Sequence, residues 1–288
     1  MSKKKYELTD ESKVVDGHKL FRIRALRDID RCRVRKGDLG GWVESEDYLS
    51  QDGRAWVYDD ACVFGNARVS GDARVFGNAR VCGDAEVMDD ASVFGNACVY
   101  GNACVRGEAL VYGNARVYGN ARVYGNACVS GKAQVFGNAR VYGNACVCGE
   151  AQVFGNACVF SNACVCGEAQ VFGNACVYED AQVCGEAQVF GNARVSGDAR
   201  VCGDADVRAL SDVIWFKNTW SSGRVFTYTR SNKKWNVGCF YGSGDELIEK
   251  AYKDSEVSGK CYEATVRYVE ALEAAMGLDK KPTKPKKD

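Results

Sequence analysis

Histidine is almost missing from this sequence. His18 is the one histidine in 288 residues, and it lies ahead of the long repeat that fills the middle of the chain. Imidazole is the side chain that most readily takes a proton near neutral pH, so the composition argues against histidine-dependent catalysis within the repeat. We interpret His18 as a structural residue, and we predict no catalytic residue.

Long apolar runs are also absent. No stretch approaches the 18 consecutive apolar residues that a membrane-spanning helix needs. Near the start, Lys3–Lys5 is followed by Glu7, Asp10 and Glu11 without the apolar segment of a secretory signal. We therefore expect a cytoplasmic protein that has no membrane partner.

Basic residues are scarce in the middle of the chain. Residues 43–207 contain 11 basic and 20 acidic side chains, an acidic excess of nine. A protein that tracks a phosphate backbone needs a basic stripe. We therefore expect no nucleic-acid partner along this part of the molecule.

A six-residue repeat dominates what is present. Valine recurs every six residues from Val57 to Val207 without a miss, over 26 hexads, and most hexads carry Gly-Asn or Gly-acid before an alanine. A period of six does not match the 3.6 residues of a helical turn, and glycine, asparagine and valine all disfavour helix. Each hexad therefore predicts a short strand followed by a bend, where glycine, asparagine and aspartate tolerate positive φ.

Like residues also align at a period of eighteen. The position after valine carries Cys148, Cys166, Cys184 and Cys202 in one series, and Tyr100, Tyr118, Phe136, Phe154, Phe172 and Phe190 in another. Three hexads per circuit would stack such residues on neighbouring parallel strands about 4.8 Å apart. The pattern predicts an all-β solenoid, a triangular prism with valine and alanine inside and 18 residues per coil.

This repeat resembles the hexapeptide-repeat, left-handed parallel β-helix proteins, whose pattern is aliphatic, variable, two turn residues, small, variable. The resemblance implies the left hand of the coil. The opening, from Gly17-His18-Lys19-Leu20 to Trp56-Val57, resembles the start of uncharacterised members carried by bacteria and their prophages.

The composition predicts four segments. Residues 1–42 form an N-terminal β cap with a strand at 19–26, and residues 43–207 form the β-helix, with two extra residues in its first coil. Residues 208–278 form an α+β domain, with a strand at 213–216, a hairpin at 224–240 and two helices. Residues 279–288, which hold both prolines, form a disordered basic tail.

The sixteen cysteines call for a separate interpretation. Most of them flank the repeated valines and should point outward, where a column of identical residues has no unique pairing, so we expect reduced thiols. Cys146, Cys148, Cys164 and Cys166 could form a four-thiol metal site. However, side chains two apart on a strand lie nearly 7 Å from each other, which is too wide for tetrahedral zinc, so we predict no metal and no cofactor.

Outward aromatic residues are the candidate binding residues. They fall on one face of the prism and in the C-terminal domain, where large apolar patches mark interaction surfaces. Ring stacking along the prism is the alternative use of the first group. The candidates are Tyr118, Phe136, Phe154, Phe172, Phe190, Trp215, Trp220, Tyr228 and Trp235.

Two functions follow as hypotheses. The first is a non-enzymatic scaffold or binding protein that self-associates, with a trimer favoured, and whose C-terminal domain contacts an unidentified protein partner. The prophage resemblance would allow a phage-related role that is host-directed or acts against host defence. The alternative is an acyltransferase-like enzyme that uses acyl-CoA at a trimer interface, as the best-known hexapeptide-repeat proteins do. The missing histidine and the lack of any loop insertion between Val57 and Val207 argue against it.

Overall fold

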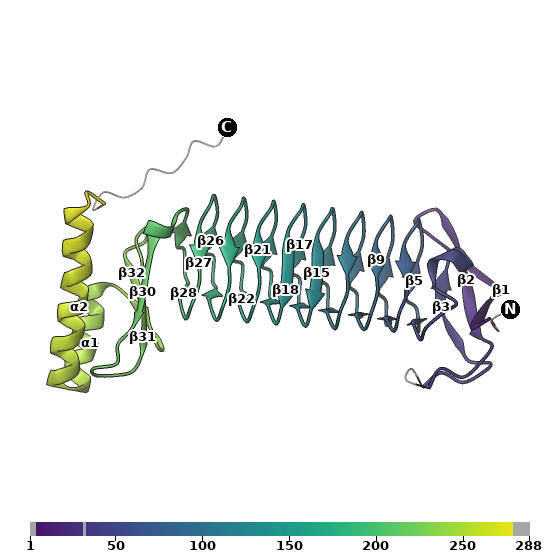
Figure 1. Ribbon diagram of the computed structural model, residues 1–288, viewed down its shortest axis with the longest axis horizontal. Coiled ribbons are helices and arrows are strands. Elements are labelled where there is room, and N and C mark those ends of the chain that lie inside the picture. The colour runs from purple at the N-terminus through teal and green to yellow at the C-terminus, as the bar shows by residue number, and fades with distance from the viewer. Residues whose placement is uncertain (1–3, 31–32, 279–288) are drawn as a thin grey trace.

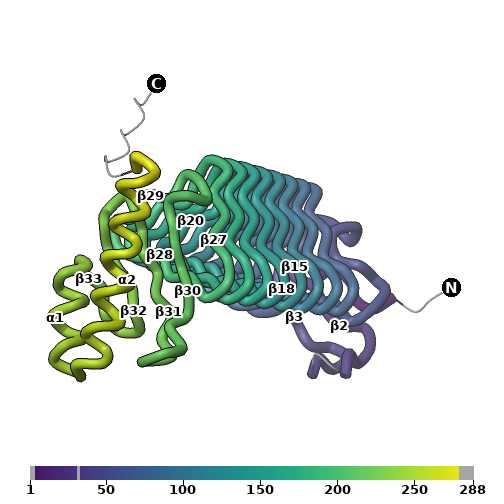
Figure 2. The backbone as a smooth tube through the Cα atoms, turned by 60° about the vertical axis from the view of Figure 1, so that its left-hand side comes forward, coloured from purple at the N-terminus to yellow at the C-terminus, as the bar shows by residue number. Residues whose placement is uncertain are grey.

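The computed structural model describes residues 4–30 and 33–278, so the predicted tail at 279–288 lies outside the described residues. The molecule is a straight rod of stacked coils with a strand cap at one end and a helix-bearing domain at the other (Figure 1). Figure 2, turned toward the rod axis, shows that the coils stack in register. The predicted solenoid of about nine parallel coils is confirmed.

Three sheets form the faces of the prism, and their strands are parallel from β3 onward. The twelve-stranded sheet, here called the aromatic face, contains in spatial order β1 (Tyr6–Val15), β2 (His18–Ala25), β3 (Leu39–Val43), β5 (Cys62–Val63), β8 (Arg80–Val81), β11 (Cys98–Val99), β14 (Arg116–Val117), β17 (Gln134–Val135), β20 (Gln152–Val153), β23 (Gln170–Val171), β26 (Gln188–Val189) and β29 (Asp206–Val207).

The nine-stranded sheet is here called the cysteine face. It contains β28 (Arg200–Val201), β25 (Gln182–Val183), β22 (Cys164–Val165), β19 (Cys146–Val147), β16 (Cys128–Val129), β13 (Leu110–Val111), β10 (Ser92–Val93), β7 (Arg74–Val75) and β4 (Trp56–Val57). The eight-stranded third face contains β27 (Arg194–Val195), β24 (Cys176–Val177), β21 (Cys158–Val159), β18 (Arg140–Gly143), β15 (Arg122–Gly125), β12 (Cys104–Val105), β9 (Glu86–Val87) and β6 (Arg68–Val69).

The register confirms eighteen residues per coil. Val147 pairs with Val165, and Val165 pairs with Val183, so each valine lies over its counterpart in the next coil. Every repeated valine and alanine from Val57 to Val207 is at most 1% exposed. The interior is therefore a continuous column of valine and alanine, as predicted. The left hand of the coil stays a prediction.

Each corner depends on the residue two positions after valine. That residue is usually glycine, with φ between 63° and 77° along the prism, a left-handed conformation in which a side chain is strained. The asparagine that follows serves a different purpose, because its side-chain amide donates to the asparagine of the next coil. One such ladder runs through Asn102, Asn120, Asn138, Asn156, Asn174 and Asn192.

Ser161 breaks the glycine rule, with φ of 61°. Relief of that strain should exceed the entropy cost of a glycine, so Ser161→Gly is expected to stabilise the protein by about 1 kcal/mol. Thermal unfolding of the full chain measures the change. Ser196→Gly is the matched control: Ser196 follows a valine directly and has no positive φ, so glycine there should destabilise. Shifts of the same sign in both variants would contradict this account of the corners.

The N-terminal cap continues the aromatic face. β2 is the predicted strand, and it pairs antiparallel with both β1 and β3. β1 was not predicted, because the middle of this strand is polar and lacks the alternation of apolar and polar residues that marks a strand. The first coil carries two extra residues, as predicted, since Val43 pairs with Val63, and the 3-10 helix η2 (Glu46–Tyr48) lies within that coil.

The C-terminal domain has one sheet and two helices. The antiparallel order is β30 (Val213–Lys217), β31 (Val225–Thr229), β32 (Lys234–Val237) and β33 (Phe240–Gly242), preceded by the 3-10 helix η3 (Leu210–Asp212). α1 (Gly244–Asp254) begins at a capping box in which Ser243 and Glu246 bond each other's backbone amides. α2 (Glu256–Ala275) packs on α1, and both helices cover the face of the sheet that points away from the prism (Figure 1).

Candidate functional site

The predicted aromatic residues of the prism form one continuous stack. From Tyr100 to Phe190, neighbouring rings on the aromatic face lie 4.8–5.0 Å apart with planes within 3° of parallel. Each such pair contributes about 0.5–1.5 kcal/mol beyond burial. The Arg208 guanidinium lies over the last ring, 5.2 Å from its centre. Stabilisation through ring stacking is thus a role of this column, while self-association along it stays a prediction that sedimentation would test.

The four predicted residues of the C-terminal domain do not share one surface. Tyr228 and Trp235 are 5% and 2% exposed and form the core under the helices with Phe226, so the prediction that they contact a partner is wrong. They are buried because they lie on the face of the sheet that the helices cover. Trp215 packs against the Gly197 corner of the prism.

Trp220 alone of the four is fully exposed, at 92%. It stands beside an open apolar groove of about 790 Å³ between the end of β30 and α2. The groove is lined by Phe216, Val257, Ala264, Thr265 and Tyr268, with Lys217 and Lys260.

Buried Asn218 fixes the loop that carries Trp220. Its side-chain oxygen accepts hydrogen bonds from the Trp220 and Ser221 amides, at 3.1 and 3.3 Å. Its amide nitrogen donates to the Ser221 hydroxyl and to the Cys261 sulfur on α2. The backbone that carries the tryptophan is therefore fixed by hydrogen bonds. An asparagine two residues before an exposed tryptophan is the sequence signal for such a turn, and the groove itself was not predicted because α2 forms its other wall.

His18 lies at the junction of cap and prism. Its Nδ1 is 3.0 Å from a carboxylate oxygen of Glu44, and its ring packs 5.1 Å from the ring of Phe64. Glu44 also accepts a hydrogen bond from the Gly65 amide. Desolvation works to raise the pKa of Glu44, but the bonds from His18 and Gly65 outweigh it, so the pKa is lowered. The contacts are those of a residue that ties the cap to the first coils.

The cysteine face differs from the prediction in two ways. Cys184 and Cys202 form a disulfide between neighbouring coils, so the expectation that this column is reduced is wrong at that pair. The expected spacing is wrong as well, because the sulfurs of Cys146, Cys148 and Cys164 all lie within 4.8 Å of one another. The estimate of 7 Å applies to Cα atoms, whereas the half-exposed side chains lean together.

The thiols of this group also affect one another's ionisation. A hydrogen bond with Cys128 lowers the pKa of Cys146, but a bond with Cys164 and burial outweigh it and raise that pKa to about 12. Burial and the neighbouring Cys148 raise the pKa of Cys166. Without a bound cation, thiols with raised pKa values stay protonated and react slowly at neutral pH.

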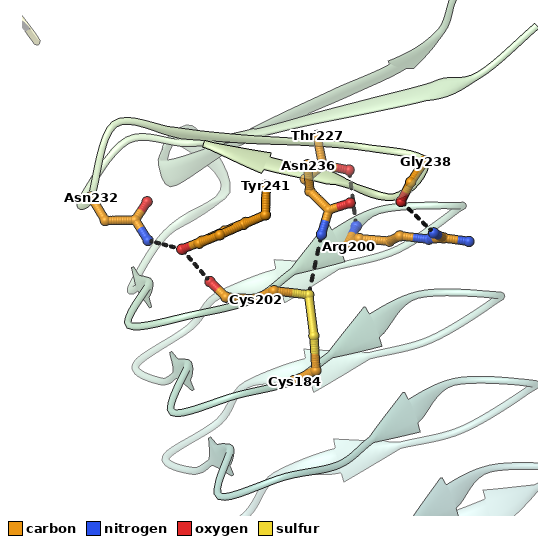
Figure 3. Close-up of a disulfide and its surroundings, with 8 residues drawn as sticks. All are labelled: Cys184, Arg200, Cys202, Thr227, Asn232, Asn236, Gly238 and Tyr241. Carbon is orange, nitrogen blue, oxygen red and sulfur yellow. Dashed lines mark hydrogen bonds between the residues drawn. A yellow bond between two sulfur atoms is a disulfide. The ribbon is translucent and has the colours of Figure 1, made fainter. Parts of the chain in front are cut away.

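The disulfide lies at the junction with the C-terminal domain (Figure 3). The Tyr241 hydroxyl donates to the Cys202 carbonyl, and the side-chain amide of Asn236 donates to the Cys202 sulfur. Beside them, the Arg200 amide donates to the Thr227 hydroxyl at 2.9 Å. These contacts hold one face of the C-terminal sheet on the last coil, and they satisfy an edge that would otherwise be open to further strands.

Comparison with known proteins bears on the prism. A family model described as YdcK Beta solenoid repeat matches residues 67–83, 109–123, 133–149, 169–185 and 187–203, all of which lie in the coils. A search of curated proteins finds no significant match. Within residues 4–30 and 33–278, no helix is long and apolar enough to cross a membrane. The matched repeats and the stacked parallel coils together identify the chain as a β-solenoid repeat protein.

Proposed function

We propose that this is a non-enzymatic binding protein in which the prism is a rigid spacer and the Trp220 groove receives a protein partner. The observation that carries the proposal is an almost fully exposed tryptophan that buried Asn218 holds beside an apolar groove. Tryptophan is the residue type most enriched among binding hot spots. Exposing one in a fixed position offers large contact area at little cost in entropy.

The lining of the groove defines the chemistry of the partner. Val257, Ala264 and Tyr268 offer apolar contact from α2, and Lys217 and Lys260 supply positive charge beside it. Lys260 already forms an ion pair with Glu256 on α2, so we expect Lys217 to attract an acidic group of the partner more strongly than Lys260 does. The occupant we propose is an apolar or aromatic peptide segment flanked by acidic residues. The prophage-like opening of the chain favours a cytoplasmic host protein as its source.

Trp220→Asp tests the proposal. Loss of a hot-spot tryptophan costs about 2 kcal/mol or more, or roughly a 30-fold rise in dissociation constant. Partners are captured with the full chain from a bacterial extract, identified, purified, and titrated calorimetrically against the parent and the variant. Binding by the parent that weakens at least 30-fold in Trp220→Asp is the expected result.

Leu210→Asp provides the matched control. Leu210 is also a strongly exposed apolar residue of the same domain, but it does not line the Trp220 groove. Its substitution should leave the dissociation constant within about twofold, since surface changes away from the contact are nearly neutral. A purified partner that binds both variants as tightly as it binds the parent would refute the groove as the binding site.

A further inference from the structure

The cysteine face gathers thiols because of how the repeat is built. Residues on either side of an inward valine both point outward, so Cys146 and Cys148 flank Val147 on the surface. The next coil repeats the arrangement, and Cys146 pairs in register with Cys164. The three sulfurs lie within 4.8 Å of one another, and all three residues are half-buried.

Two further thiols border the group. Cys166 interacts with both Cys148 and Cys164, and Cys128 exchanges a hydrogen bond with Cys146 from the preceding coil. Beyond Cys166 the column continues into Cys184, which is already paired with Cys202. The cluster is therefore bounded by a disulfide on one side, and its own members carry free sulfurs.

This spacing suits the geometry of a metal–thiolate centre. A metal–sulfur bond of about 2.3 Å sets the ligand sulfurs about 3.8 Å apart in a tetrahedron and about 4.0 Å apart in a trigonal plane. Sulfurs already within 4.8 Å need to move by less than about 1 Å, which a small rotation about χ1 supplies on a half-exposed surface. Soft thiolate ligands select Cu⁺ and Zn²⁺ over hard cations.

We infer that Cys146, Cys148 and Cys164 form a binding site for one thiophilic d¹⁰ metal ion, Cu⁺ with three thiolates or Zn²⁺ with Cys166 as the fourth ligand. Each thiol transfers its proton to solvent as its metal–sulfur bond forms. Because the ligands come from two successive coils, the bound ion would also fasten those coils together.

Metal titration of the full chain tests the inference. The protein is reduced and handled without oxygen, then titrated with Zn²⁺ against a chromophoric chelator and with Cu⁺ against a copper-specific chelator. We expect one tightly bound equivalent per chain, and Co²⁺ in place of zinc should give the intense charge-transfer bands of a thiolate complex. Cys146→Ser and Cys148→Ser should each weaken binding by more than about 100-fold, the upper limit for the loss of a second-shell partner.

Cys176→Ser is the matched control. Cys176 is a half-buried cysteine on the third face that pairs in register with Cys158, so that site offers two stacked thiols and no third. Its substitution should leave metal affinity unchanged. The inference fails if the reduced parent retains no metal against either chelator, or if Cys176→Ser weakens binding as much as Cys146→Ser. It also fails if disulfide mapping of the protein before reduction shows Cys146 and Cys164 joined to each other.

Discussion

Val165→Asp is expected to lower the free energy of unfolding by at least about 4 kcal/mol. Val165 is 0% exposed and stacks between Val147 and Val183. The variant loses roughly 1.5–3 kcal/mol of valine burial and places an unpaired carboxylate in an interior made of valine and alanine. Losses of this size are confined to a few mechanisms, of which an unpaired buried charge is one.

The damage should be local because the fold is one-dimensional. Each coil contacts only its neighbours, so coils next to residue 165 should open while distant coils stay folded. Amide hydrogen exchange locates the opening, and thermal unfolding gives its size. Gln182→Asp is the control: Gln182 lies on the adjacent coil of the same face, but its side chain is exposed. If Val165→Asp unfolded at the same temperature as Gln182→Asp, the inward placement of valine would be disproved.

Asp212→Ala is expected to detach the C-terminal domain from the prism at a cost of about 3–5 kcal/mol. The Asp212 side chain accepts hydrogen bonds from the amides of Arg208 and Ala209, at 2.8 and 3.0 Å. Its other oxygen lies 2.7 Å from the Arg230 guanidinium, and the side chains of this pair are 5% and 15% exposed. Removing one partner of a buried ion pair leaves the other charge uncompensated.

Limited proteolysis and thermal unfolding measure this change together. Cleavage near residues 208–213 should accelerate, while the main unfolding transition of the prism stays close to that of the parent, because the coils are untouched. Glu249→Ala serves as control, since its ion pair with Lys253 is exposed and such pairs contribute little. Equal proteolysis rates for Asp212→Ala and the parent would mean that the pair does not hold the junction.

The prism could be predicted from the sequence because the same pattern of an inward valine followed by a bend occurs in 26 consecutive hexads. A valine every six residues specifies an inward position, and a glycine two residues later specifies a left-handed corner. The stacking of Phe154 on Phe172 then follows from the period alone. An error at one position would not change the predicted solenoid, because neighbouring hexads show the same pattern of valine and glycine.

The ends of the rod lack that redundancy. The polar segment Asp10–Lys13 gives little sign of a strand, although Asp16-Gly17, with φ of 52° and 86°, is a typical hairpin turn. The sequence does not tell whether the aromatic side chains of Tyr228 and Trp235 face a partner or a helix. The packing of α2 on the sheet determines that they are buried. The distance between the sulfurs of Cys146 and Cys148 likewise depends on side-chain rotation, which the sequence period does not specify.

The number of hexads determines both the length of the rod and the rotation of one end relative to the other. Adding three hexads would move the cap and the Trp220 groove about 4.8 Å further apart and return every later side chain to its original face. Adding a single hexad would instead turn the groove by a third of a revolution and carry each later cysteine to the next side. Distance between the ends and their relative azimuth are thus set by one integer, the number of hexads.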